Sequence, residues 1–152
     1  MKLFVSLMTI ILLSVFVSSC GKSPQEDHSY ESQAIQEQLK GTMNLNKLDL
    51  NVELTWLKGP FGDPAFESSF LMIVRDNKGE IKSLDPKYHF YINAWMPSMG
   101  HGSAYDGDTE QSSTGVYLHR DLYFNMPGDW EVYIDVYEGE ELIDSTKLRI
   151  DL

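Results

Sequence analysis

Residues 48–56 read Leu-Asp-Leu-Asn-Val-Glu-Leu-Thr-Trp, a strict alternation of large apolar and polar side chains. Successive side chains of a β-strand point to opposite faces of its sheet, so this period of two predicts a strand with one buried face. The same alternation returns in residues 129–137, near the end of the chain. We expect both segments to be half-buried strands that place their apolar faces on a common core.

Further strands are expected where apolar runs stand between clusters of Gly, Pro, Asn and Asp, the residues typical of turns. The expected strands are residues 48–56, 70–75, 88–95, 115–125, 129–137 and 142–152, with a short edge strand at 104–106. No internal repeat is present, and no helical period stands out after residue 46. About seven short strands in about 105 residues predict an all-β domain with one core. The expected fold is an immunoglobulin-like antiparallel β-sandwich, with a small barrel as the alternative.

The N-terminus is typical of a secretory signal. Lys2 precedes an apolar run at residues 3–17, and small residues then lead to Cys20. The run is short for a membrane span, and no basic stop signal follows it. Residues 17–21 resemble a bacterial lipobox, whose cysteine is acylated and becomes the mature N-terminus; an ordinary secretory signal or an uncleaved anchor is the alternative. The expected division is a lipoprotein signal peptide at 1–19, Cys20 and a flexible polar linker at 20–46, and a β-sandwich domain at 47–152.

Composition limits the classes of function. The chain has 12 Lys and Arg against 23 Asp and Glu, a formal net charge of -11. Its positive side chains are too few, against this excess of acidic ones, to displace counterions from phosphates, so a nucleic-acid partner is not expected. Charge does not favour adhesion to anionic lipid either, which leaves the acyl chains on Cys20 to hold the protein to its membrane. We expect an extracytoplasmic location in the cell envelope, on the periplasmic face of a bacterial membrane.

Two turns rich in methionine carry the most specific chemistry in the sequence. Residues 95–102 read Trp-Met-Pro-Ser-Met-Gly-His-Gly and place Met96, Met99 and His101 within six residues. A second Met-Pro pair begins at Met126. The third and sixth strands of a seven-stranded sandwich are antiparallel neighbours. The end of the third strand is therefore expected beside the start of the sixth, which would bring these four side chains to one end of the sandwich.

Ligands of these types suit a soft cation. Thioether sulfur is soft and uncharged and imidazole is intermediate, so Met96, Met99, His101 and Met126 predict a Cu(I) site. Thioethers form no disulfides, and they stay available outside the cytoplasm, where thiols are oxidised. Cys20 is the only cysteine, so neither a disulfide nor a thiolate metal site is expected in the folded part. Methionines also plug the open ends of sandwiches, and that purely structural role is the alternative.

The other candidate residues are weaker. Alternation places His119 on the outward face of its strand, and His89 facing solvent or the neighbouring sheet. An acidic cluster in a long loop offers oxygen ligands but lacks the rest of a calcium loop; it comprises Asp106, Asp108 and Glu110. Four tyrosines are candidates for an exposed partner-binding face: Tyr117, Tyr123, Tyr133 and Tyr137. The chain has no cysteine nucleophile and no credible Ser-His-Asp ordering, so an enzyme is not expected.

Residues 96–102, 115–117 and 124–130 together resemble the YtkA-like/FixH-like family. The most specific pieces are the Met-Pro-x-Met-Gly-His turn and a Gly-x-Tyr followed by Pro-Gly-x-Trp. The resemblance covers about residues 48–150 and implies an extracytoplasmic, immunoglobulin-like β-sandwich. FixH-like members are associated with copper supply to cbb₃-type cytochrome oxidase, although this chain carries a lipobox where they keep a transmembrane helix.

This resemblance implies a metal role for Met96, Met99, His101 and Met126. The expected function is that of a lipid-anchored accessory protein that binds Cu(I) for delivery to, or protection of, a membrane partner such as an oxidase or a metal-efflux complex. A metal-free, immunoglobulin-like interaction module of the cell envelope is the alternative.

Overall fold

The computed structural model describes residues 40–152, so the expected signal peptide, the lipidation of Cys20 and linker residues 20–39 lie outside the described chain. Nine strands make up the described elements, and no helix is among them. The strands are β1 (Lys40–Leu45), β2 (Leu50–Lys58), β3 (Ser68–Asp76), β4 (Tyr88–Met96), β5 (His101–Gly102), β6 (Asp108–Ser113), β7 (Val116–Leu122), β8 (Asp129–Glu138) and β9 (Glu141–Asp151).

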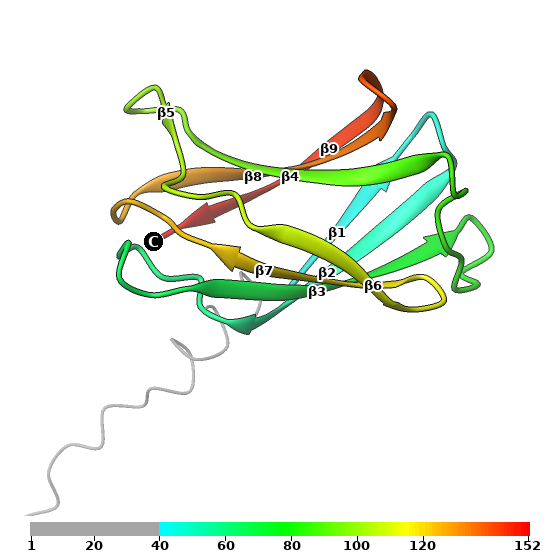
Figure 1. Ribbon diagram of the computed structural model, residues 1–152, viewed down its shortest axis with the longest axis horizontal. Helices are drawn as coiled ribbons and strands as arrows, with labels where there is room; N and C mark the ends of the chain where they lie inside the picture. The colour runs from blue at the N-terminus through cyan, green and yellow to red at the C-terminus, as the bar shows by residue number, and fades with distance from the viewer. Residues whose placement is uncertain (1–39) are drawn as a thin grey trace, which may run out of the picture.

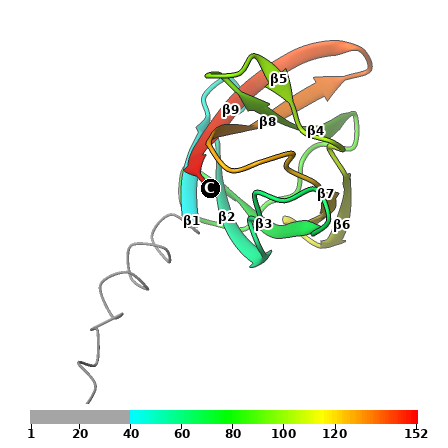
Figure 2. The same ribbon diagram turned by 90° about the vertical axis from the view of Figure 1, so that its left-hand side faces the viewer.

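The strands form two antiparallel sheets packed face to face (Figures 1 and 2). The strand order is β1-β2-β3-β7-β6 in one sheet and β5-β4-β8-β9 in the other. The expected β-sandwich is therefore confirmed, and the barrel alternative is not. If β2 to β9 are lettered A, B, C, C′, D, E, F and G, the sheets read A-B-E-D and C′-C-F-G, which is the connection order of immunoglobulin domains. β1 is an additional strand beside A; kinship with immunoglobulin domains stays a prediction.

The core lies between the inner faces of the two sheets, as the alternation of β2 and β8 predicts. Every second residue of these strands is buried; the set is Leu50, Val52, Leu54, Trp56, Trp130, Val132, Ile134 and Val136. Near one end, the ring of Phe124 packs edge-on against Trp130, with ring centroids 5.0 Å apart. Burying a side chain of this size stabilises the fold by about 1.5–3 kcal/mol. This aromatic pair therefore forms a well-packed part of the core below the loops at that end.

The folded domain begins before residue 47, the start expected from the sequence. β1 occupies Lys40–Leu45, inside the stretch assigned to the polar linker, and pairs along its whole length with β2. Met43 and Leu45 are buried, with 6% and 0% of their surface exposed. The boundary at residue 47 is therefore too late, because two apolar side chains suffice to dock this short edge strand on the core.

The alternation along β7 reverses at Asp121, and this reversal places His119 inside the protein. Asp121 has φ 58, a left-handed conformation, and the pairing register between β3 and β7 shifts at the same place. Tyr117 and His119 are buried before the shift, and Leu122 and Phe124 after it. One extra residue moves the following side chains to the other face. The expectation that His119 and Tyr117 face outward is wrong for this reason.

The irregular stretch after β4 also differs from expectation. It forms the two-residue strand β5 and the longer strand β6. The expected edge strand at residues 104–106 is reduced to a single bridge between Tyr105 and Tyr123. The chain thereby crosses from one sheet to the other, and it leaves β5 too short to cover the edge of β4.

Candidate functional site

The two methionine turns lie at the same end of the sandwich. β4 and β8 are antiparallel neighbours, and Trp95 pairs with Glu131. Met96, the last residue of β4, therefore lies beside the loop that leads into β8. Figure 1 shows the β4–β5 hairpin and the β7–β8 loop at one end of the molecule. The end of the third expected strand lies beside the start of the sixth, as the sequence predicts.

Met96 and His101 are a directly opposed pair in the β4–β5 hairpin. Opposed residues of antiparallel strands project from the same face, with their Cβ atoms about 4.5–5.5 Å apart. The connecting turn closes because the Met96 carbonyl accepts the Gly100 N–H at 2.8 Å. Gly100 has φ 68, a left-handed conformation that glycine adopts without a steric cost. The hairpin thus starts a methionine and a histidine side chain from neighbouring Cβ positions on the same face.

The thioether of Met96 packs against the second turn. A Cβ atom built on Gly128 would lie 2.1 Å from the Met96 Cε and 3.6 Å from its Sδ. Only the missing side chain of Gly128 leaves room for this methionine, which is 5% exposed. A hydrogen bond between the Ser98 hydroxyl and the Asp129 carboxylate ties the hairpin to the start of β8. The two turns are therefore in direct contact.

Three contacts orient the His101 ring, which is half-buried. Its Nδ1 lies 2.9 Å from the Gly102 carbonyl oxygen. The Asn125 amide nitrogen lies farther from Nδ1, at 3.5 Å. A carbonyl only accepts hydrogen bonds, so we assign the proton to Nδ1 from the shorter contact. The same oxygen accepts a hydrogen bond from the Asn125 amide at 2.9 Å, and the ring meets Trp130 edge-on with centroids 5.6 Å apart. These contacts hold both the tautomer and the plane of the imidazole.

The second ring nitrogen of His101 has no partner. Nε2 is buried, and no described residue forms a hydrogen bond with it. With the proton on Nδ1, Nε2 carries a lone pair, and leaving a buried polar atom unpaired costs about 1–3 kcal/mol. A histidine that binds a metal commonly donates its other N–H to a backbone carbonyl in this way. The ring is therefore held in the form that metal ligation requires.

The remaining two methionines are more exposed. Met126 has 37% of its surface exposed, and its backbone is held in place because its carbonyl accepts the Trp130 Nε1–H at 3.0 Å. Met99, in the turn of the hairpin, is 60% exposed. The structure thus joins Met96 and His101 in one pair, puts Met126 in the loop packed against them, and leaves Met99 largely in solvent.

Sequence reasoning missed the residues that support this pair. The Asn125 amide donates a hydrogen bond to the Gly102 carbonyl, and the Trp130 ring contacts the His101 ring. Gly128 leaves the space that Met96 occupies. All three stand within four residues of Met126, in the segment that suggested the family resemblance. Proximity to the motif was the available signal, but their contacts with the hairpin depend on the folded sheet.

His119 is a structural residue. Its Nδ1 lies 2.8 Å from the Thr109 hydroxyl and its Nε2 lies 2.8 Å from the Asp106 carbonyl oxygen. Its ring stacks on Phe70 with centroids 4.7 Å apart. Burial disfavours the imidazolium form and lowers the pKa of His119 from 6.5 to about 4. Both nitrogens are engaged, so this histidine offers no free lone pair to a metal.

The other weak candidates stay apart from the methionine turns. His89 is exposed and stacks on Tyr137 with centroids 5.9 Å apart. The Asp106 carboxylate accepts hydrogen bonds from the Ser103 hydroxyl and, at 3.3 Å, from the Tyr91 hydroxyl. Within residues 40–152, no group of three or more His, Cys, Asp or Glu side chains is placed to hold a metal ion.

No family model, curated protein or solved structure matches this chain. The likeness to the YtkA-like/FixH-like family therefore stays a prediction from the motif residues. In the part of the chain that the structure describes, no helix is long and apolar enough to cross a membrane.

Proposed function

We propose that this protein is a lipid-anchored, extracytoplasmic accessory protein that binds Cu(I) at the two methionine turns and delivers it to a membrane partner. The observation that carries the proposal is the buried, unpaired Nε2 of His101, directly opposite Met96 in the hairpin. A lone pair held beside a thioether, with a second methionine in the adjoining loop, is a donor set for a soft cation.

The four candidate ligands differ in exposure, which suits a Cu(I) ion that the protein must both bind and release. Met96 and His101 are fixed by packing and hydrogen bonds and would form the constant part of the site. Met126 and Met99 reach the surface and would exchange between the cation and solvent. All four ligands are neutral when they bind, so the site adds no charge of its own to hold the cation. The protein's net charge of -11 raises the local concentration of cations instead.

The described chain starts at the methionine end of the domain. Lys40, the first residue of β1, pairs with Thr55 near the end of β2. The loop that follows β2 reaches the second methionine turn, because a Cβ atom on Gly62 would lie 2.8 Å from the Pro127 backbone. A linker from Cys20 would therefore enter the domain at the methionine end, which favours transfer to a membrane-embedded partner.

The alternative is a metal-free interaction module. Exposed apolar side chains at the methionine end favour it, since such side chains are typical of contact surfaces; they include Phe61, Phe66, Trp95 and Met99. In this alternative Met96 and His101 are only packing residues. A partner that binds equally well to metal-free protein and to a variant without the ligands would favour this role.

Competition with a Cu(I) chelator tests the metal site. Residues 21–152 are titrated without oxygen, and Met96→Leu, His101→Ala and Met126→Leu each weaken Cu(I) binding at least tenfold. The matched control is Met72→Leu, which makes the same exchange in the core away from the turns; it leaves binding unchanged, because this exchange costs little in packing. Unchanged Cu(I) binding in a variant that lacks all four ligands would overturn the proposal.

A further inference from the structure

The sandwich is closed along one side and open along the other. On the closed side β1 contacts β9, where a Cβ atom on Gly41 would lie 2.7 Å from the Leu148 side chain. On the opposite side the sheets end in β4 with its short partner β5, and in β6. β6 touches β4 over fewer residues than β1 touches β9, so this side is the more open one. Figure 2 shows β1 beside β9 at one side, and β4 and β6 at the other.

The edge of β4 lacks a strand partner over most of its length. β8 pairs with β4 from Tyr88 to Trp95 on one side, whereas β5 pairs only with Trp95 and Met96 on the other. Residues 88–93 thus have no described strand on the open side, an edge about 20 Å long at the rise of a β-strand. Such an edge is a template for pairing with another chain.

The direction of the backbone groups follows from Ala94. Its carbonyl accepts the Ser103 N–H at 2.9 Å, and its N–H points to the Asp106 carboxylate at 3.4 Å, both on the open side. In an antiparallel strand alternate residues turn their N–H and C=O groups to the same side. Phe90 and Ile92 therefore turn their backbone donors and acceptors to the open side as well. Phe90 is half-buried and Ile92 is only 3% exposed, so a partner strand has to displace the atoms that cover Ile92.

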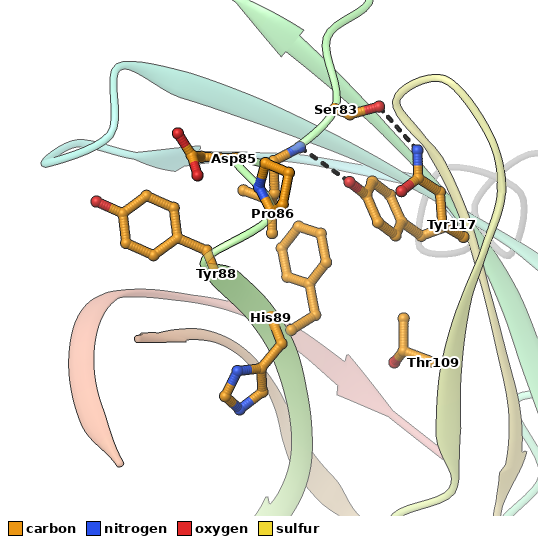
Figure 3. A pocket seen from close by; sticks show the side chains of 10 residues that line it. Ser83, Asp85, Pro86, Tyr88, His89, Thr109 and Tyr117 are labelled. Atoms are coloured by element: carbon orange, nitrogen blue, oxygen red, sulfur yellow. Dashed lines mark hydrogen bonds between the residues drawn. The ribbon is translucent and has the colours of Figure 1, made fainter. Parts of the chain in front are cut away.

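A cavity of about 480 Å³ lies beside this edge. Tyr88 and His89 of β4 stand on one side of it, and Thr109 and Tyr117 on the other (Figure 3). The far wall is rigid, since the Tyr117 hydroxyl accepts the Leu84 N–H at 2.9 Å. The cavity is larger than a single side chain needs, and it opens between the two sheets.

The core is incompletely covered at this cavity. Tyr88, Phe90 and Ile92 share the inward face of β4, yet Ile92 is buried whereas Tyr88 and Phe90 are half-buried. Phe90 meets Tyr117 edge-on with centroids 4.9 Å apart. An apolar side chain entering the cavity would therefore complete an aromatic cluster that solvent now reaches.

The charge around the open side favours a basic partner. Asp106, Asp108 and Glu110 follow one another along β6 and the segment before it, and Asp85 lies at the cavity. The nearby cations are already paired, Arg120 with Glu110 at 2.9 Å and Lys87 with Glu138 at 3.2 Å. A second copy of this acidic chain would bring like charges together along the same edge, which opposes association.

We propose that the open edge of β4 binds an extended, basic peptide segment of a partner protein. The segment adds a strand to β4 through the backbone of Phe90 and Ile92, and it places an apolar side chain in the cavity. Strand addition supplies affinity through main-chain hydrogen bonds, and the cavity supplies selectivity for alternate side chains. The surface is separate from the methionine turns, and the proposal does not depend on a bound metal.

A synthetic peptide tests the geometry. The probe is Lys-Val-Lys-Phe-Lys-Val-Lys with a fluorescent label, measured by anisotropy with the full mature chain in the presence of a chelator. Two further probes carry N-methyl groups on alternate residues, one on the Lys set and one on the Val and Phe set. In an added strand only alternate N–H groups of the peptide face β4. Methylation of those groups weakens binding at least tenfold, and methylation of the other groups does not. Equal binding of both methylated probes would overturn strand addition.

Variants of the protein test the cavity and the charge. Gln111→Trp, at an exposed position of β6, blocks the cavity mouth and weakens binding at least tenfold. Asp108→Lys weakens it more than Asp151→Lys, a matched charge reversal on β9 at the closed side. Backbone hydrogen exchange of Phe90 and Ile92 slows on binding. Unchanged affinity in Gln111→Trp, unchanged exchange at these two amides, or a dimer paired through β4 in the free protein would each refute the proposal.

Discussion

Met96 and His101 face each other across the β4–β5 hairpin, and the thioether of Met96 fills the space that Gly128 leaves open in the opposite loop. This relationship makes the two turns a single packed unit, in which moving one turn displaces the methionine of the other. Because Gly128 has no side chain that could bind a metal, a substitution there changes the packing of Met96 without removing a ligand.

The Gly128→Ala variant tests this coupling. A Cβ atom there would meet the Met96 Cε at 2.1 Å, and the residue has φ 148, a conformation that favours glycine. We expect a loss of about 2 kcal/mol in the free energy of unfolding, measured with denaturant, together with weaker Cu(I) binding. Gly139→Ala is the matched control, because Gly139 has φ 61 and nothing within 4 Å. It carries only backbone strain of about 1 kcal/mol, and it leaves Cu(I) affinity unchanged.

The Asn125→Ala variant tests the support of the histidine. It removes the amide that holds the Gly102 carbonyl, the same oxygen that accepts the His101 Nδ1–H. Loss of such a supporting contact lowers metal affinity by about 10–100-fold, while the unfolding free energy falls by only about 1 kcal/mol. Chelator competition and denaturant titration on the same samples separate the two effects. Equal Cu(I) affinity in Asn125→Ala and wild type would show that the ring needs no such support.

Local pattern predicted much of the fold, because alternation in residues 48–56 and 129–137 reports directly which face is buried. It failed where one residue changed the outcome. Asp121 in a left-handed conformation reversed the faces of β7, and no apolar spacing signals such a residue in advance. β1 was missed because its two inward side chains, Met43 and Leu45, are too few to stand out from a polar stretch.

The candidate site, too, was predictable from the sequence only in part. Residue types at the turns suggested Met96, Met99, His101 and Met126, and the order of strands placed both turns at one end. The open edge of β4 could not be foreseen, since it follows from β5 being only two residues long. The residue types of the hairpin turn, residues 97–100, do not predict how far β5 pairs with β4. The pairing ends where the chain crosses to the other sheet.

The closed side of the sandwich is secured by Asp144, whose carboxylate accepts the N–H groups of Lys47 and Leu48 at 2.7 and 3.1 Å. The Ser145 N–H also donates to this carboxylate, at 2.9 Å. Asp144 is 6% exposed, so Asp144→Ala removes the acceptor of three backbone donors. We expect a loss of about 2–4 kcal/mol in the free energy of unfolding. Asp151→Ala on the same strand is exposed and changes it by less than about 0.5 kcal/mol. Similar losses in both variants would contradict this role.

Anchoring of the protein by Cys20 is tested in cells. Wild-type protein is expected in the membrane fraction and in the detergent phase of a detergent partition, because the proposed acyl chains on the cysteine would hold it there. Cys20→Ser removes the acylated atom and shifts the protein to the aqueous phase or leaves its signal uncleaved. Ser14→Ala, inside the apolar run, is the control and behaves as wild type. A wild-type protein that carries no lipid by mass spectrometry would refute the assignment.

His119 makes the stability of the domain depend on pH. Burial lowers its pKa in the folded state from 6.5 to about 4, so the unfolded chain binds more protons between these two values. The free energy of unfolding therefore rises with pH from about 4 to 6.5, and for this group the full change is about 3 kcal/mol. The Asp106 carbonyl and the carboxylates of Asp106 and Asp108 favour the charged form and partly oppose the effect of burial on the pKa. The Thr109 hydroxyl contacts the other ring nitrogen.

Denaturant unfolding at several pH values between 4 and 7 measures this dependence. His119→Gln removes the titrating group and flattens the profile over this range, although it also lowers stability at neutral pH. His89→Gln is the matched control at an exposed position and keeps the wild-type slope. A His119→Gln profile as steep as that of wild type would show that other groups cause the dependence. The cost arises from desolvation of the imidazolium, so it persists in high salt, whereas the effects of surface ion pairs are screened.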